Sequence, residues 1–341
     1  MSAPNPVPRP LHGGRLLVAA SRYGIAPADW LDLSTGINPQ PWPVPAVPQE
    51  VWQRLPEDDD GLEAAAADYY GCASLLPVAG SQAAIQLLPL LFPRNRVAIL
   101  SPTYSEHPHG WHQAGHQVRS VTADEIEAAV DSSDILLLVQ PNNPTGNLFP
   151  PERVLGWRDR LAARGGTLVV DEAFIDATPE AGVVAHCAAG NEGKGLIVLR
   201  SLGKFFGLAG ARVGFVFAQR AILDALAVRL GPWPVAGPSR WVAQRALADR
   251  VWQQSQRVQL KQAGARLASL VRDAGWGETS GCALFQFVRT PHAAALYDAF
   301  ARRGILLRLF EDLSALRVGL PADEAQWQRL EAVVRDLSRG A

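Results

Sequence analysis

Five short apolar runs, separated by segments with helical patterns, constrain the fold of this 341-residue chain more than any other feature. These runs are residues 97–100, 135–139, 167–170, 196–199 and 213–217. Apolar side chains follow one another in them without polar alternation, which is typical of strands buried on both faces of a parallel sheet. Residues 124–130 and 152–164, between the runs, have the pattern of helices. The chain is therefore predicted to be an α/β protein with a mostly parallel central sheet.

The pattern changes after residue 231, where three prolines follow within seven positions: Pro232, Pro234 and Pro238. The sequence beyond them predicts a smaller α+β domain. Its expected helices are residues 240–274, 293–303 and 323–337, and its expected strands are 284–288, 305–309 and 315–320. We therefore divide the chain into residues 1–48, an N-terminal arm and part of the small domain, residues 49–231, the large domain, and residues 232–341, the small C-terminal domain.

Composition excludes several classes of function. The formal net charge is −1 and no basic block is present, which argues against a nucleic-acid partner. Cys72, Cys187 and Cys282 are far apart and lack metal-ligand spacing, so we expect no metal site and a reducing compartment. No apolar run reaches the roughly 18 residues of a membrane span, and the start lacks the apolar core of a signal peptide. We expect a cytoplasmic protein without a membrane partner.

Lys204 is the most unusual charged residue, because only three of the 32 basic residues are lysines. It follows the run 196–199, next to Gly203 and two phenylalanines, with Ser201 before it and Arg212 after it. A lysine amine can form a Schiff base with an aldehyde, which a guanidinium cannot. The hydroxyl, the amine and the guanidinium could together hold a phosphate and an aldehyde of one molecule. The alternative is a solvated lysine in a glycine-rich loop.

Polar side chains follow four of the predicted strands. Tyr104, Asn143, Asp171 and Lys204 come shortly after successive runs. Carboxyl ends of parallel strands meet at one edge of a sheet, where ligands of open α/β folds bind. Any one of these residues could belong to an ordinary turn or cap, but four together predict a site. Residues 80–82, Gly-Ser-Gln before a predicted helix, could bind an anion, although most such pairs are only caps.

Four motifs in this order and spacing resemble those of the fold-type-I pyridoxal-phosphate (PLP) enzymes, the relatives of aspartate aminotransferase. They are Pro-Asn-Asn-Pro-Thr-Gly at 141–146, Asp-Glu-Ala-Phe at 171–174, Ser-Leu-Gly-Lys at 201–204, and Arg212. The resemblance implies a fold-type-I PLP-dependent transferase fold, PLP as cofactor and residues 49–231 as the PLP-binding domain. It also implies a homodimer with the active site at the subunit interface.

The resemblance assigns roles residue by residue. Lys204 forms the bond to the cofactor and later moves protons, Asp171 pairs with the ring nitrogen, and Tyr104 stacks on the ring; these three are the predicted catalytic residues. Asn143 is expected to hydrogen-bond the ring oxygen. The predicted cofactor-binding set is Gly80, Ser81, Gln82, Tyr104, Asn143, Asp171, Ser201, Lys204 and Arg212.

Within this superfamily the chain resembles the histidinol-phosphate aminotransferase branch, and in particular the L-threonine-O-3-phosphate decarboxylases of cobalamin biosynthesis. The residues that carry this resemblance are 12–14 (His-Gly-Gly), 34–39 (Ser-Thr-Gly-Ile-Asn-Pro), 304–308 and 316–318. By resemblance the substrate contacts are His12, Gly13, Asn38, Asn143, Arg308 and Arg317. Two arginines suit a substrate with a phosphate and a carboxylate.

The resemblance leaves three functions open. The first is decarboxylation of L-threonine O-3-phosphate to (R)-1-aminopropan-2-yl phosphate and CO2, which His12-Gly13 and Phe174 favour. The second is a histidinol-phosphate-type aminotransferase that uses 2-oxoglutarate. The third is a catalytically silent PLP-binding module, against which the retention of Lys204 and Asp171 argues. Leu55 departs from the family pattern, because it stands where a tyrosine normally reaches the partner subunit's PLP phosphate.

Overall fold

The computed structural model describes residues 12–187 and 193–339, and the largest sheet in these ranges has seven strands in the order β2-β8-β7-β6-β5-β3-β4. The strands are β2 (Leu75–Val78), β3 (Arg96–Leu100), β4 (Gln117–Val121), β5 (Ile135–Val139), β6 (Thr167–Asp171), β7 (Leu196–Ser201) and β8 (Gly214–Phe217). Strands β3 to β7 pair in parallel, whereas β8 is antiparallel to both of its neighbours. The predicted α/β class with a mostly parallel central sheet is confirmed.

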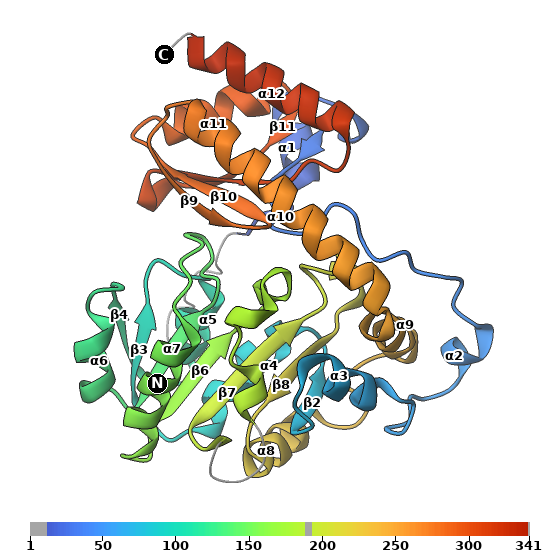
Figure 1. Ribbon diagram of the computed structural model, residues 1–341, viewed down its shortest axis with the longest axis vertical. Helices are drawn as coiled ribbons and strands as arrows, with labels where there is room; N and C mark the ends of the chain where they lie inside the picture. The colour runs from blue at the N-terminus through green and yellow to red at the C-terminus, as the bar shows by residue number, and fades with distance from the viewer. Residues whose placement is uncertain (1–11, 188–192, 340–341) are drawn as a thin grey trace, which may run out of the picture.

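Helices cover both faces of this sheet (Figure 1). They are α3 (Leu62–Tyr70), α4 (Ser81–Leu87), α5 (Glu106–Gln113), α6 (Ile126–Ser132), α7 (Pro151–Ala162) and α8 (Arg220–Leu230). Along β5, Leu136 and Leu138 belong to one hydrophobic cluster, whereas Ile135, Leu137 and Val139 belong to the other. This alternation between two cores explains why the strand is apolar at every position.

A smaller antiparallel sheet lies further along the described chain, in the order β12-β13-β10-β9. Its strands are β9 (Glu278–Cys282), β10 (Phe285–Arg289), β12 (Arg308–Phe310) and β13 (Ala315–Gly319). Helices α1 (Leu16–Tyr23), α11 (Ala293–Ala301) and α12 (Glu324–Arg339) lie in this part of the molecule (Figure 1). The smaller α+β part expected from the sequence is thus present.

The N-terminal segment joins this smaller part, because β1 (Leu31–Asp32) pairs in parallel with β11 (Ile305–Leu306). The run 305–309, predicted as one strand, is divided at Leu307 between two sheets: β11 pairs with β1, and β12 pairs with β13. The division into residues 1–48, 49–231 and 232–341 stays our proposal, and the β1–β11 pairing supports assigning the N-terminal segment to the small domain.

The prediction of a single long helix over residues 240–274 was wrong. The structure has α9 (Gly237–Ala248) and α10 (Arg250–Asp273), separated at Asp249. The Asp249 carboxylate accepts a hydrogen bond from the backbone nitrogen of Trp252 at 3.0 Å and caps α10. Because an N-cap side chain replaces the missing helical partners, it favours a new helix start here. Helix α10 then runs from the large sheet to the smaller one (Figure 1).

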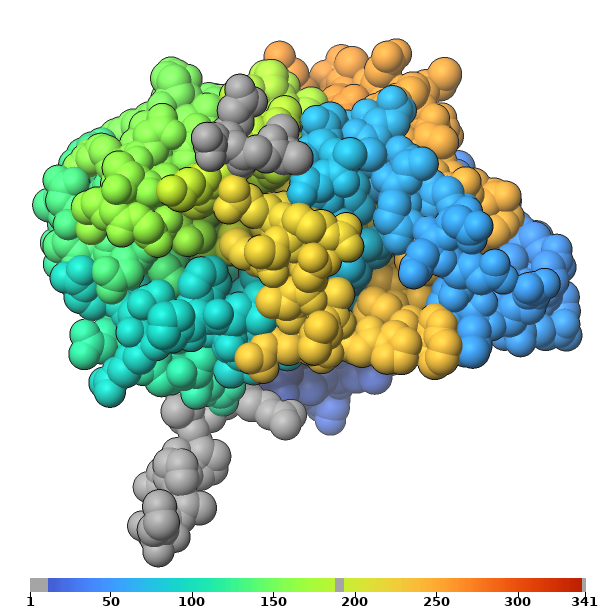
Figure 2. All heavy atoms as spheres, turned by 90° about the horizontal axis from the view of Figure 1, so that it is seen from below, coloured from blue at the N-terminus to red at the C-terminus, as the bar shows by residue number. Residues whose placement is uncertain are grey.

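Between β1 and α2 (Gln49–Gln53) the chain forms an extended arm along one side of the molecule (Figure 1). The backbone nitrogens of Asn38 and Trp42 donate to the carbonyls of Lys204 and Phe206, at 3.0 and 2.9 Å. The arm therefore fixes the loop that carries Lys204. In Figure 2 the blue N-terminal segments lie at the surface beside the yellow segments of the large part. Among the residues described, no helix combines the length and apolar character that crossing a membrane requires.

Candidate active site

The structure brings the four predicted strand-end residues to one edge of the large sheet. Tyr104 follows β3, Asn143 follows β5, Asp171 ends β6 and Lys204 follows β7. These four strands are consecutive neighbours in the sheet, in the order β3-β5-β6-β7. Since all four run in parallel, their carboxyl ends form a continuous edge. The structure thus places all four residues at the edge where the sequence predicts a site, and their roles there stay predictions.

Lys204 lies in a loop whose other large side chains are fully buried: Leu202, Phe205 and Phe206. Its Nζ lies 5.3 Å from the centre of the Phe174 ring. Burial, followed by the positive charge of Arg317, lowers the pKa of Lys204 to about 8, against the opposing effect of Asp171. The uncharged fraction of the amine near neutral pH is therefore much larger than for an ordinary lysine, and the uncharged form is the nucleophile toward an aldehyde.

Asp171 is held in place by a histidine that the sequence analysis did not single out. Nε2 of His107 lies 2.9 Å from Oδ2 of Asp171, and both side chains are almost fully buried. Oδ1 of Asp171 accepts from the backbone nitrogen of Ala173 at 3.0 Å. The carboxylate is therefore fixed at both oxygens. The only available sequence signal was proximity, because His107 lies at the start of α5, three residues after the predicted site residue Tyr104.

A small cradle for an anion lies beside Lys204. A Cβ atom at Gly80 would lie only 2.5 Å from Nη2 of Arg212, so the glycine lets the guanidinium approach the backbone. The same argument applies at Gly214, whose Cβ would lie 2.6 Å from the backbone nitrogen of Ser81. The Ser201 hydroxyl accepts from the backbone nitrogen of Gly203 at 3.2 Å. A guanidinium, backbone nitrogens and a hydroxyl are the donors that a phosphate needs.

These residues fit PLP. An amine with a lowered pKa is next to a buried carboxylate, and an anion cradle adjoins both. Tyr104 lies beside them, and burial, followed by the charges of Glu106 and Asp171, raises its pKa to about 12, so its hydroxyl stays protonated. The individual roles predicted for Gly80, Ser81, Gln82, Ser201 and Arg212 toward the cofactor stay predictions.

Two arginines face the same site from the smaller sheet. Arg308 on β12 and Arg317 on β13 are direct partners in the antiparallel register, so their side chains project from one face. The Arg317 guanidinium donates to Oδ1 of Asn143 and, at 3.0 Å, to the carbonyl of Ser34. Burial, and then the charge of Arg308, lowers the pKa of Arg317 to about 10. Burial likewise lowers the pKa of Arg308.

The Arg317 guanidinium is buried without a counter-ion in the described part of the chain. It is buried, with 7% of its surface exposed, and no carboxylate in the described part of the chain forms a salt bridge with it. Its Nε has no hydrogen-bond partner among these residues. A buried cation with only neutral partners is costly unless an anion arrives. Together with Arg308 it can receive a ligand that carries two anionic groups.

The N-terminal residues His12 and Gly13 also reach this site. Nε2 of His12 lies 2.6 Å from Oε1 of Glu106, and the His12 ring centre is 5.6 Å from that of Tyr104. A Cβ atom at Gly13 would lie 2.5 Å from the Ser34 carbonyl oxygen, so only glycine fits there. This brings His12 next to a residue of the sheet edge. The predicted substrate contacts of His12 and Gly13 stay predictions.

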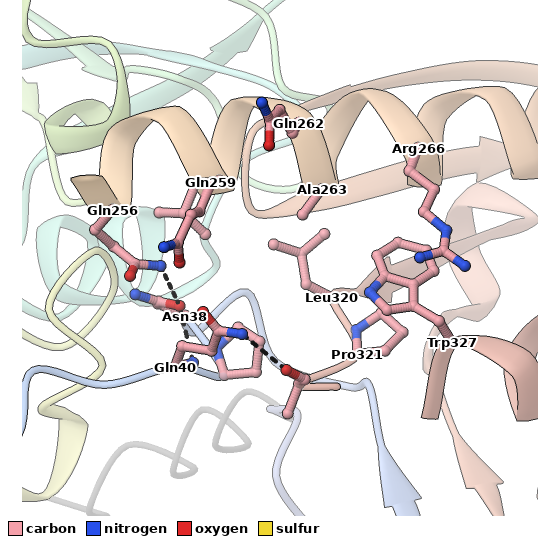
Figure 3. Close-up of a pocket in the computed structure, with 13 residues that line it drawn as sticks. Asn38, Gln40, Gln256, Gln259, Gln262, Ala263, Arg266, Leu320, Pro321 and Trp327 are labelled. Carbon is pink, nitrogen blue, oxygen red and sulfur yellow. Dashed lines mark hydrogen bonds between the residues drawn. The ribbon is translucent and has the colours of Figure 1, made fainter. Parts of the chain in front are cut away.

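Asn38 is buried between the loop that carries Lys204 and helix α10. Its Nδ2 donates to the carbonyl of Phe205 at 2.7 Å, and its Oδ1 accepts from the backbone of Gln40 and from Nε2 of Gln256. On the far side of Asn38 a cavity of about 440 Å³ lies between the arm, α10 and the start of α12 (Figure 3). In the structure Asn38 thus ties the Lys204 loop to α10. Its predicted contact with substrate stays a prediction.

Comparison with known proteins places this arrangement among characterised enzymes. The family model for aminotransferase class I and II matches residues 29–330. A threonine-phosphate decarboxylase from Pseudomonas aeruginosa is 57% identical over 95% of this chain and 96% of its own length. One from a Sinorhizobium species is 43% identical over 94% and 96%. The crystal structure of L-threonine-O-3-phosphate decarboxylase from Porphyromonas gingivalis has a TM-score of 0.78, at 19% identity, and covers 91% of this chain and 99% of that one.

Proposed function

Because this chain belongs to the aminotransferase class I and II family, whose members use PLP, we propose that it is a PLP-dependent lyase that decarboxylates L-threonine O-3-phosphate. The products are (R)-1-aminopropan-2-yl phosphate and CO2, and we place the reaction in cobalamin biosynthesis. The observation that carries the proposal is the similarity to two threonine-phosphate decarboxylases, at 57% and 43% identity over nearly the full length of the chain. The facing arginines Arg308 and Arg317 support it, since this substrate carries a phosphate and a carboxylate.

The residues at the sheet edge have distinct tasks in this reaction. PLP supplies an electron sink for the bond that breaks at the α-carbon. Asp171, oriented by His107, provides a fixed negative charge for the cationic ring nitrogen. Lys204 would hold the cofactor covalently, and after the substrate amine displaces it, its protonated form could donate a proton to the α-carbon. Its lowered pKa suits both tasks near neutral pH.

If PLP occupies this site, orientation would decide which bond to the α-carbon breaks, because the bond held perpendicular to the ring would be the one cleaved. We assign Arg317 to the substrate carboxylate and Arg308 to its phosphate. Arg317 is fixed by Asn143 and by the Ser34 carbonyl, so it can hold a carboxylate in one direction. The same machinery with the Cα–H bond perpendicular would give a histidinol-phosphate-type aminotransferase, which is the alternative to be tested.

We further propose a cytoplasmic homodimer. Helix α2 and the segment after it expose two large apolar side chains, Trp52 at 62% and Leu55 at 63%, which favours contact with a second copy. A cavity of about 380 Å³, lined by Val51, Leu55 and Trp241 among others, adjoins them. Leu55 cannot supply the hydroxyl that a tyrosine would offer to a partner's cofactor.

All three cysteines are free, as in a reducing compartment. Neither nucleic acid nor membrane is proposed as a partner.

The test is a product assay on PLP-loaded protein. We expect L-threonine O-3-phosphate, without any keto acid, to release CO2 over many turnovers and to give 1-aminopropan-2-yl phosphate by NMR. Lys204→Ala is the control for catalysis by this site. If CO2 is absent but 2-oxoglutarate supports amino transfer from histidinol phosphate, the protein is the aminotransferase. If neither reaction occurs although PLP is bound, the protein is a catalytically silent PLP-binding module.

A further inference from the structure

Glu106 is a buried carboxylate next to the site, and the mechanism above gives it no task. It is 8% exposed and begins α5, two residues after Tyr104. Oε1 lies 2.6 Å from Nε2 of His12, and Oε2 accepts from the side-chain amides of Gln82 and Gln86 at 2.7 and 3.0 Å. No lysine or arginine in residues 12–187 and 193–339 forms a salt bridge with it. Its one ionisable hydrogen-bond partner there is His12.

A carboxylate at this place conflicts with its surroundings. Gln82 follows Gly80 and Ser81 of the anion cradle, and Tyr104 donates to Oε1 of Gln82 at 3.3 Å. Glu106 is also the charge that contributes most, after burial, to raising the pKa of Tyr104. A negative charge so close to the anion cradle would oppose a phosphate bound there. Its presence is explained if it acts on a cationic group that itself meets the substrate.

His12 can be that group. With the Nε2 proton directed to Glu106, only Nδ1 is left for a ligand, and no described protein group hydrogen-bonds Nδ1. An anion at each nitrogen can accept a hydrogen bond from the ring, and Nδ1 is the position open to a ligand. The His12 ring stands 5.6 Å from the Tyr104 ring, at the edge of the substrate space, with its side chain 42% exposed. It is therefore accessible to a substrate that enters from solvent.

We infer that Glu106 is a positioning residue for substrate selection: it orients His12 and fixes the Nε2 proton, so that Nδ1–H donates to the phosphate of the substrate. Phosphorylated amines are thereby selected over their unphosphorylated counterparts. This inference rests on the proposed function, since it assumes a phosphorylated amino acid as substrate. The competing explanation is that Glu106 only joins α4 to α5 through the two glutamines.

The test measures phosphate selectivity by binding, on the PLP-loaded protein. The probes are 1-aminopropan-2-yl phosphate and 1-aminopropan-2-ol, and the readout is the ratio of their dissociation constants by calorimetry. We expect Glu106→Gln and His12→Gln each to reduce this ratio roughly 10- to 100-fold, as for one hydrogen bond to a charged group. Because Glu106 acts through His12, the double variant should match the His12 single variant.

Gln86→Met is the matched control, since it removes one donor to Glu106 from α4 without touching His12. It should leave the ratio unchanged. The cofactor's visible absorbance and the Tm of each variant verify that the site is folded. His12 lies at the start of the described chain, so His12→Gln is expected to fold and still tests the inference if Glu106→Gln does not fold.

Three outcomes would overturn the inference. If the wild-type protein prefers the phosphate strongly and Glu106→Gln keeps that preference, or if the two single effects add in the double variant, Glu106 does not act through His12. If the wild-type protein shows no preference at all, the phosphorylated substrate of the proposed function fails as well.

Discussion

Two buried arginines show how this fold separates its scaffold from its site. Arg200, on β7, is 2% exposed, and its guanidinium contacts Oε2 of Glu172 and Oδ1 of Asp176, both at 2.7 Å. Arg317, on β13, is 7% exposed, and among the described residues its guanidinium hydrogen-bonds only an amide oxygen and a backbone carbonyl. Burial alone lowers the pKa of each. The two carboxylates reverse this effect for Arg200, whose pKa is raised, whereas the pKa of Arg317 is lowered to about 10.

The difference concerns where the counter-ion comes from. The counter-ions of Arg200 are two carboxylates of the same chain, so folding alone forms its ion pairs and its role is structural. Arg317 lacks such a charge and is ready to receive one from a ligand. A buried arginine is therefore informative about function only when its protein partners are counted, and burial alone does not distinguish the two cases.

The largest expected effect is on stability at Arg200. Arg200→Met should reduce the free energy of unfolding by about 3–5 kcal/mol, because it leaves two buried carboxylates without a counter-charge. Denaturant titration of the cofactor-free protein measures this. The triple variant with Glu172→Gln and Asp176→Asn removes those charges and should recover part of the loss. A single variant as stable as the wild type would contradict the scaffold role.

The next effect is on selectivity at Arg308, which we assign to the phosphate. Arg308→Ala should lower kcat/KM for L-threonine O-3-phosphate roughly 10- to 100-fold more than for L-threonine, as expected for a lost charge-assisted contact. Steady-state kinetics with both substrates gives the ratio. Arg266→Ala is a matched control, because that arginine pairs with Glu324 and Glu331 on the opposite helix α12. An equal loss for both substrates would refute the phosphate assignment.

The smallest effect concerns Lys204, whose pKa is lowered partly by the charge on Arg317. Between about pH 8 and the ordinary lysine pKa of roughly 10.4, the unfolded state binds more protons at this residue than the folded state. Stability of the cofactor-free protein should therefore rise with pH in this window, by at most about 1.4 kcal/mol per pH unit. The comparison is with Lys204→Met, in which this contribution disappears. Identical pH profiles of the two proteins would contradict the lowered pKa.

Much of the catalytic edge was predictable from sequence. Continuous apolar runs identify buried parallel strands, and polar residues directly after them must meet at one edge. That logic located Tyr104, Asn143, Asp171 and Lys204 without knowledge of any side-chain contact. It also separated the large part from the smaller α+β part, because the spacing of strands and helices changes after residue 231.

The remaining features depend on tertiary contacts. The pairing of Arg308 with Arg317 follows from the register of β12 and β13, and the turn between them gives no sequence signal for it. His107 and Glu106 lie on α5, whose sequence Glu-His-Pro-His-Gly-Trp-His-Gln has little helical character. Strand β4 lies at the sheet edge with most residues partly exposed, so it lacks the apolar run of its neighbours.

The most direct test of this account is to measure stability and catalysis together for Arg317→Met. If the counter-ion of Arg317 is the substrate carboxylate, kcat/KM for L-threonine O-3-phosphate should fall about 10²- to 10³-fold, the cost of removing one partner of a buried charge pair. The free energy of unfolding should change by no more than about 1 kcal/mol, because the loss of two hydrogen bonds is offset by removal of a buried cation that has no carboxylate partner among the described residues. A variant that loses several kcal/mol of stability while it retains kcat/KM would show that Arg317 belongs to the scaffold, as Arg200 does.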